Sequence, residues 1–171
     1  MSIETIQHAV AEVREFLLAN PEKGRGADSQ ARAIYHEGLQ FRVHGPNDAA
    51  IVTDMPTAVG GGGNAPTPGW FMRAGLASCD ATLIAMRAAE VGIRLTTLEV
   101  AVDNISDDRG MFGIGDDIPP GVLNMQTCIR IRAENASHEQ LNRIVEDALA
   151  HSPVADAIRR AVPMSHEIEF V

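Results

Sequence analysis

The chain has 171 residues, of which 45% are hydrophobic, and 14 basic against 23 acidic residues give it a formal net charge of -9. This length suits one compact domain with a hydrophobic core, and the negative charge disfavours nucleic acid and anionic membranes as partners. The N-terminal segment carries acidic residues and no unbroken apolar run, so neither a signal peptide nor a membrane span is expected and a cytoplasmic protein is favoured.

The first expected element is an amphipathic helix between the capping residue Ser2 and the interruption at Pro21. The apolar residues that recur there at helical spacing are Ile6, Val10, Val13 and Leu17. Residues 31–54 change to a period of two, in which Leu39, Phe41 and Val43 alternate with polar side chains. Short antiparallel strands are therefore expected after the helix.

The longest predicted helix follows a run of four glycines, residues 60–63, that is interpreted as a flexible connection. Thr67 is a capping residue before a proline, and Gly92 is the expected left-handed terminator. The helix would be on the order of 36 Å long. Larger side chains form one stripe and small ones a neighbouring stripe: Met72, Leu76, Cys79, Leu83 and Met86, then Ala74, Ser78, Ala81, Ala85 and Ala88. A central helix that a second backbone can approach closely is expected.

Two more strands are predicted after this helix. Leu98, Val100 and Val102 alternate with polar side chains, and the same period returns from Met125 to Ile131. Between these strands, residues 107–121 are expected to form a long loop rich in glycine, proline and aspartate.

The C-terminal part predicts two helices and a closing strand. Ser137 and Gln140 form a capping box, and Ser152 caps a short helix that begins with a proline. Residues 164–171 are interpreted as the closing strand, with His166 on its apolar side as a core histidine. The order of elements is that of an α+β fold.

The two cysteines, Cys79 and Cys128, have no CxxC companion, which argues against both a zinc site and a disulfide-built scaffold. The six histidines are scattered without ligand spacing, so neither a metal nor a cofactor is expected. Taken by itself, Cys79 is most simply a small core residue. Cys128 lies on the face of its strand opposite Met125 and Ile129, so it is predicted to point away from the long helix and not to pair with Cys79.

Residues 60–79, with the sequence GGGGNAPTPGWFMRAGLASC, resemble the motif of the OsmC-like family, which ends in a cysteine inside a long helix. The resemblance extends over residues 30–171, so the chain is divided into an N-terminal amphipathic helix and linker, residues 1–29, and an OsmC-like domain. It implies an α+β fold in which curved antiparallel sheets wrap long central helices. It also implies an intertwined homodimer with a site at the subunit interface.

In this family the central-helix cysteine attacks a hydroperoxide, and a second cysteine resolves the sulfenic acid as a disulfide. The resemblance therefore makes Cys79 the catalytic candidate. Ser152 stands at the position of the second cysteine, and a hydroxyl cannot form a disulfide. The catalytic branch also carries a glutamate where this chain has Gly69, and an arginine whose position falls near Val59.

A cation is needed to stabilise a thiolate in the middle of a helix. Arg42 or Arg73 could supply it from elsewhere in a dimer, although no motif supports either residue. His151 could also approach Cys79 if the family geometry holds, and a solvated histidine at a helix end is the simpler alternative.

Two hypotheses of different class follow. The first is a peroxidase-type enzyme, a hydroperoxide reductase that uses Cys79 alone with an external thiol reductant. The alternative is a redox-silent dimeric scaffold that binds a small apolar ligand or acts in a stress response, which the missing partner residues favour. A thiol sensor in which oxidation of Cys79 shifts the dimer is a third possibility, and the sequence leaves open whether the protein is an enzyme.

Overall fold

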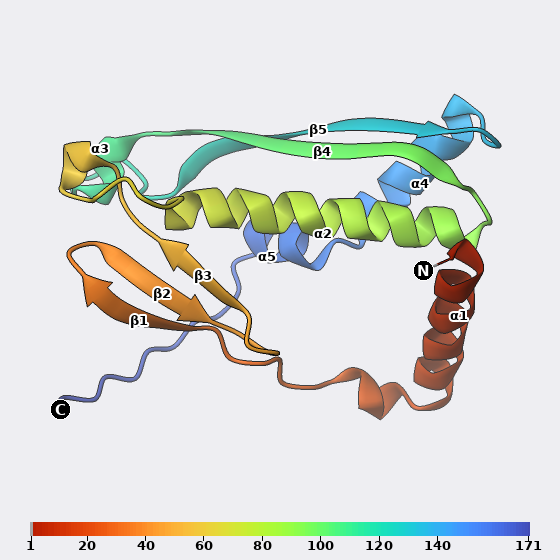
Figure 1. Ribbon diagram of the computed structural model, residues 1–171, viewed down its shortest axis with the longest axis horizontal. Helices are drawn as coiled ribbons and strands as arrows, with labels where there is room; N and C mark the ends of the chain where they lie inside the picture. The colour runs from red at the N-terminus through yellow and green to blue at the C-terminus, as the bar shows by residue number, and fades with distance from the viewer. Residues whose placement is uncertain (1) are drawn as a thin grey trace. The chain divides into compact units, whose positions relative to one another are not determined.

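The computed structural model describes residues 2–171, and these residues belong to two compact units. One unit contains the residues up to Gln7 together with Leu76–Val171, and the other contains His8–Gly75. Helices α1 (Ile3–Ala19) and α2 (Pro68–Glu90) each have residues in both units (Figure 1). The predicted division after residue 29 stays a prediction.

Helix α1 confirms the expected N-terminal helix, whose first turn is closed by the Thr5 amide donating to Ser2 Oγ at 3.3 Å. None of the residues of α1 is buried. Its apolar side chains are therefore largely open to solvent within the described chain, and Leu18 is 82% exposed.

The unit His8–Gly75 contains a three-stranded antiparallel sheet in the order β1-β2-β3, as the alternating pattern predicts. The strands are β1 (Arg32–Glu37), β2 (Gln40–His44) and β3 (Ala50–Thr53), and two short 3-10 helices, η1 (Pro21–Gly24) and η2 (Thr57–Val59), flank the sheet. Leu39 was expected in a strand and lies instead in the turn between β1 and β2, where Gly38 has a φ of 53°. The turn begins at Gly38, one residue before Leu39, where the predicted alternation of apolar and polar side chains begins.

The glycine run is not a flexible connection, because it folds around a buried carboxylate. Asp54 is 2% exposed and accepts the amides of Met55, Gly62 and Asn64 at 2.7, 3.2 and 3.1 Å. A Cβ on Gly61 would lie 1.9 Å from the Met55 carbonyl oxygen, so only glycine fits there. The glycines permit close backbone packing at this point, and the carboxylate fixes the loop.

Helix α2 begins and ends where the sequence predicts. The Trp70 amide donates to Thr67 Oγ1 at 3.2 Å, and Gly92 ends the helix with a φ of 70°. The 23 residues span about 34 Å. The buried stripe differs from the predicted one: the buried residues of α2 are Leu76, Asp80, Ile84, Ala88 and Ala89. Met72 is exposed and Cys79 is partly exposed, because the packed face is rotated from the stripe that hydrophobicity alone selects.

The unit that contains Leu76–Val171 is built on the long antiparallel pair β4 (Leu95–Ser106) and β5 (Val122–Ala133), which runs along α2 (Figure 1). The predicted loop between them contains one short helix, α3 (Asp108–Met111), capped by Asp107. Helices α4 (His138–Ala150) and α5 (Pro153–Arg159) follow with the predicted caps, including the full Ser137 and Gln140 box.

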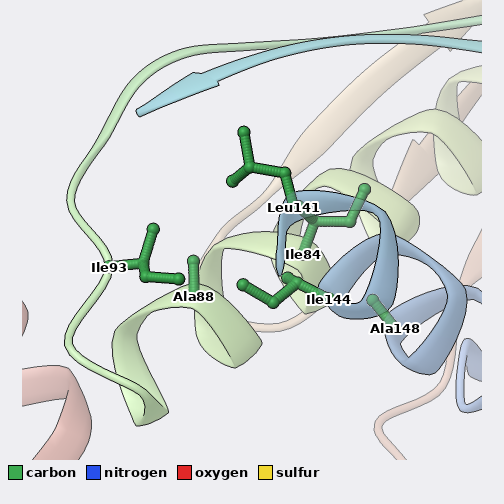
Figure 2. Packing of buried hydrophobic residues seen from close by; sticks show 6 residues of the cluster. All are labelled: Ile84, Ala88, Ile93, Leu141, Ile144 and Ala148. Carbon is green, nitrogen blue, oxygen red and sulfur yellow. The ribbon is translucent and has the colours of Figure 1, made fainter. Parts of the chain in front are cut away.

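The core of this unit lies between α2, α4 and the segment that follows α2. Its buried residues are Ile84, Ala88, Ile93, Leu141, Ile144 and Ala148 (Figure 2). Leu98, Val100, Ile129 and Ile131 of the strand pair pack against this cluster. The core thus holds α2 in place along the helical turns that follow Cys79.

The predicted closing strand is wrong for this chain on its own. Residues 164–171 form no strand, His166 is exposed rather than a core histidine, and Phe170 is 92% exposed. An alternating pattern becomes a strand only when a neighbouring strand pairs with it, and no described strand of this chain does so.

Among residues 2–171, no helix is both long enough and apolar enough to cross a membrane.

Candidate functional site

Cys79 and Ser152 meet inside the unit that contains Leu76–Val171. Ser152 is the N-cap of α5 and is 1% exposed. Its hydroxyl donates a hydrogen bond to Cys79 Sγ across 3.5 Å. The same oxygen accepts the amide of Ala155 at 3.4 Å. The cap therefore orients the hydroxyl, since its lone pair is directed to the helix and its proton to sulfur.

Within residues 2–171, the described donor to Cys79 Sγ is a neutral hydroxyl and not the cation expected from the sequence. A hydroxyl that donates to sulfur stabilises a thiolate more than a thiol, and the thiolate is the nucleophile. The Cys79 residue is partly exposed. Ser152 was expected to be a helix cap, and the structure gives it a second contact that the capping motif did not predict.

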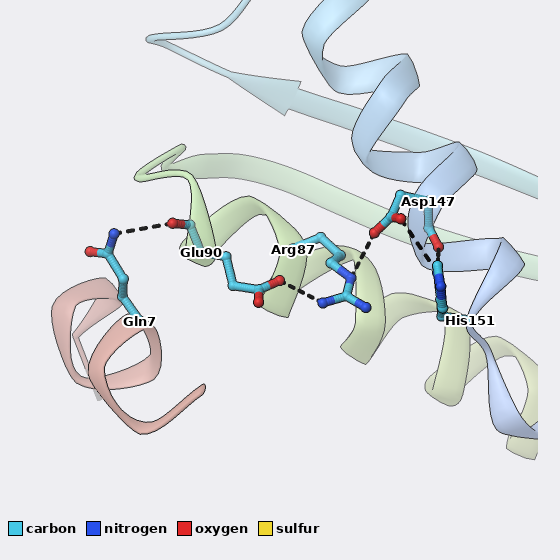
Figure 3. Close-up of polar contacts among 5 residues, drawn as sticks. All are labelled: Gln7, Arg87, Glu90, Asp147 and His151. Carbon is cyan, nitrogen blue, oxygen red and sulfur yellow. Dashed lines mark hydrogen bonds and ion pairs between the residues drawn. The ribbon is translucent and has the colours of Figure 1, made fainter. Parts of the chain in front are cut away.

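His151, which could approach Cys79 if the family geometry holds, makes its contacts with Asp147 (Figure 3). Its Nδ1 donates to the Asp147 carbonyl oxygen at 2.7 Å and lies 3.4 Å from Asp147 Oδ1. The side chain is exposed at the end of α4, which agrees with the solvated helix-end alternative. Arg42 and Arg73 belong to the unit His8–Gly75, whereas Cys79 belongs to the other unit.

Arg87, further along α2, is also paired. Its Nη1 lies 2.7 Å from Glu90 Oε2, and its Nε lies 2.8 Å from Asp147 Oδ2, as Figure 3 shows. The hydrogen bond that Arg87 donates to Glu90 raises the pKa of the guanidinium above its ordinary value. Gln7 Nε2 donates to the Glu90 carbonyl oxygen at 3.1 Å and ties α1 to the end of α2 within this unit. The ion pairs of Arg87 therefore link α2 to α4, and its charge is used by Glu90 and Asp147 rather than by Cys79 Sγ.

Cys128 lies on β5 opposite Ala101 and is exposed, as predicted. Both cysteines are free thiols. The reactivity of the Cys128 thiol therefore provides a comparison for that of Cys79 in the same protein.

The polar residue that sequence reasoning missed is Asp80, which is 2% exposed on α2. Its Oδ1 has no hydrogen-bond partner within residues 2–171. The signal was its spacing, four residues after Leu76 and four before Ile84, which puts it on the buried stripe. The predicted apolar stripe of α2 included Cys79 and did not include Asp80.

Asp80 lines a pocket of about 460 Å³. The pocket is bounded by α2, the first half of β5, the end of α4, and α5. Residues 2–171 contain no group of three or more His, Cys, Asp or Glu side chains that could hold a metal ion.

The chain is similar to known proteins in both sequence and fold. The family model for the OsmC-like protein matches residues 61–167. An OsmC-like protein from Mycoplasma pneumoniae is similar in structure, with a TM-score of 0.67, 14% identity, and coverage of 80% of this chain and 91% of that chain. A comparison with curated proteins found no match.

Two further solved structures carry a functional description of their own. An organic hydroperoxide resistance protein OsmC from Legionella pneumophila has a TM-score of 0.58 and 20% identity, and covers 79% of this chain and 91% of that one. An organic hydroperoxide resistance protein from Elizabethkingia anophelis has a TM-score of 0.57 and 16% identity, and covers 80% and 91%. At these identities the likeness shows the fold, which confirms the expected combination of helices and antiparallel sheets.

Proposed function

The chain belongs to the OsmC-like protein family, and we propose that it reduces a hydroperoxide through Cys79 with an external thiol as the reductant. One observation carries the proposal: the oriented Ser152 hydroxyl donates to Cys79 Sγ at 3.5 Å. The organic hydroperoxide resistance proteins of the same fold support the choice of substrate class.

The reaction has two steps. The Cys79 thiolate attacks the terminal oxygen of a hydroperoxide, the O–O bond breaks, and the departing alkoxide takes up a proton to become an alcohol. Sulfur gains the oxygen as a sulfenic acid. A dithiol then attacks that sulfur, releases water, and reduces the mixed disulfide with its second thiol, which regenerates Cys79 and leaves the dithiol as a disulfide.

Ser152 accounts for the need for an external thiol. It occupies the position where the resemblance implies a second cysteine, and it contacts Cys79 directly. A hydroxyl donates to the sulfur but forms no disulfide, so the sulfenic acid has to be reduced by a thiol from solution. A cytoplasmic setting suits this chemistry because small and protein thiols stay reduced there.

We infer that the working form is a homodimer, which the exposed apolar residues Met164, Ile168 and Phe170 support. A second copy would provide the neighbouring strand that residues 164–171 lack in the single chain. Sedimentation equilibrium of the full chain should give twice the monomer mass. Deletion of residues 164–171 should then weaken the dimer, and a monomeric full chain would contradict the inference.

The experiment for the reductase is steady-state loss of cumene hydroperoxide in the presence of dithiothreitol. Native protein and the Cys128→Ser variant are expected to turn over many equivalents at the same rate, and the Cys79→Ser variant is expected to be inactive. Equal loss of hydroperoxide with native and Cys79→Ser protein would contradict the proposal.

The second candidate function, a redox-silent scaffold that binds a small apolar ligand, is favoured by the pocket beside Asp80. It predicts that native protein consumes no more than one equivalent of hydroperoxide per thiol, even with excess dithiothreitol. The same assay therefore separates the two candidates.

A further inference from the structure

The pocket beside Asp80 is lined by residues of α2, β5, α4 and α5, all within the unit that contains Leu76–Val171. Its lining residues are Leu76, Asp80, Val122, Leu123, Asn124, Met125, Thr127, Leu149, Ala155, Ile158 and Arg159. Seven of these are aliphatic or methionine side chains or alanine, and the volume of about 460 Å³ is within the range of small-molecule sites. The cavity therefore suits an apolar body with few polar groups.

Asp80 is the buried polar group of this cavity. It is 2% exposed, yet Oδ1 has no hydrogen-bond partner in residues 2–171. A buried carboxylate oxygen without a donor is costly, and most such atoms in proteins are paired. A donor from outside the chain that enters the pocket would remove that cost.

The chemistry of the site favours a cationic donor. A carboxylate binds an ammonium group more strongly than a neutral hydroxyl, because the hydrogen bond is charge-assisted. The net charge of -9 also favours the approach of cations. The hydrogen bond from Arg160 mainly lowers the pKa of Asp156, and Arg159 adds a smaller coulombic effect. Arg159 also lines the pocket, but it is exposed, so solvent screens its charge more than that of buried Asp80.

We propose that this pocket binds a small primary amine with an apolar body, whose ammonium group donates to Asp80 Oδ1. Cys79 is not among the lining residues, so the site does not require the thiol. The inference is therefore independent of the proposed hydroperoxide reduction, and either can fail while the other holds.

The first arm of the test uses native protein and three probes with the same six-carbon chain. Isothermal titration calorimetry should show hexylamine binding at least about tenfold more tightly than hexan-1-ol, the usual advantage of a hydrogen bond to a charged group. Hexanoate should bind most weakly. Amide chemical shifts should change at residues 122–127 and 155–159. Equal affinities for the three probes, or a preference for hexanoate, would overturn the proposal.

The second arm uses variants that change charge or space. Asp80→Asn should lose the preference for hexylamine over hexan-1-ol, whereas Asp117→Asn, which removes the same charge from an exposed loop, should keep it. Ile158→Trp changes a partly exposed wall of the pocket and leaves the carboxylate in place, so it should weaken hexylamine and hexan-1-ol together. Undiminished hexylamine binding in folded Asp80→Asn would contradict the assignment.

A third arm separates this site from the redox proposal. Cys79→Ser protein should bind hexylamine with the native affinity, although it should reduce no hydroperoxide. Loss of amine binding in that variant would show that the two sites are one and would contradict a separate amine site.

Discussion

Cys79 and Ser152 are 73 residues apart in sequence, and the Ser152 hydroxyl reaches Cys79 Sγ at 3.5 Å. The contact depends on two local structures. Helix α2 presents Cys79 one position before the buried stripe residue Asp80, and the cap of α5 fixes the serine oxygen through the Ala155 amide. A single side-chain change at either end should therefore alter the chemistry of the sulfur.

Replacing Ser152 with cysteine should create a redox pair. A disulfide bond is about 2.05 Å long, so small rotations of two side chains that now meet at 3.5 Å would close it. In a Cys128→Ser background, one equivalent of hydroperoxide should give an intramolecular disulfide between residues 79 and 152. Mass spectrometry without reductant should detect the loss of both thiol hydrogens. Two free thiols after oxidant treatment would contradict the contact.

Ser152→Ala should reduce both stability and thiol reactivity. Loss of the cap of α5 is expected to cost about 1 kcal/mol in free energy of unfolding. Loss of the donor to sulfur should slow oxidation of Cys79 by about tenfold. Urea denaturation and stopped-flow oxidation measure the two effects.

Ser137→Ala is the matched control, because Ser137 caps α4 and has no described contact with Cys79. It should lose a similar free energy of unfolding and leave the oxidation rate unchanged. A parallel loss of rate in both variants would assign the effect to general destabilisation and not to the hydrogen bond.

Local signals in the sequence predict most of the fold. Caps at Thr67, Ser137 and Ser152 and the terminator Gly92 fix helix ends through contacts within a few residues. Such contacts do not depend on the rest of the chain, so they are visible in sequence. The predicted closing strand at residues 164–171 was wrong because a strand needs a neighbouring strand to pair with, and alternating side chains do not show whether the chain provides one.

The candidate site is less predictable. The capping motif predicts that Ser152 begins a helix, but not that its hydroxyl faces a sulfur 73 residues away. Asp80 was missed because a hydrophobic stripe is drawn through apolar residues, and a buried carboxylate interrupts it. The four glycines indicate freedom of the backbone, and only the structure shows that they are needed for close packing around Asp54.

Asp54 should make stability depend on pH in acid. The Asn64 amide, opposed by desolvation and assisted by the Met55 and Gly62 amides, holds the pKa of Asp54 below its ordinary value of 3.8. The folded state thus binds the proton less readily than the unfolded state. Asp54 therefore adds stability at pH above 3.8, and this contribution is lost as the pH falls through the lower pKa of the folded state.

The measurement is the free energy of unfolding of native and Asp54→Asn protein as a function of pH. Native protein should be the more stable near neutral pH, and the difference should shrink as the pH falls below 3.8. A difference that stays constant, or grows in acid, would contradict the role assigned to the carboxylate.

Gly61→Ala should destabilise the loop around Asp54. The added Cβ would meet the Met55 carbonyl oxygen at 1.9 Å, so the backbone must move. Gly26→Ala is the control, since its Cβ would meet nothing within 4 Å. Thermal unfolding should show a lower midpoint for Gly61→Ala only, and equal midpoints for the two variants would show that the loop is not tightly packed.

The most direct measurement of the central claim asks which thiol is oxidised first. Native protein is treated with less than one equivalent of cumene hydroperoxide, trapped with dimedone, and digested for peptide mass spectrometry. Partly exposed Cys79 should carry the adduct before exposed Cys128, because only Cys79 receives the Ser152 hydrogen bond. An adduct on Cys128 with Cys79 unmodified would contradict a reactive sulfur in α2.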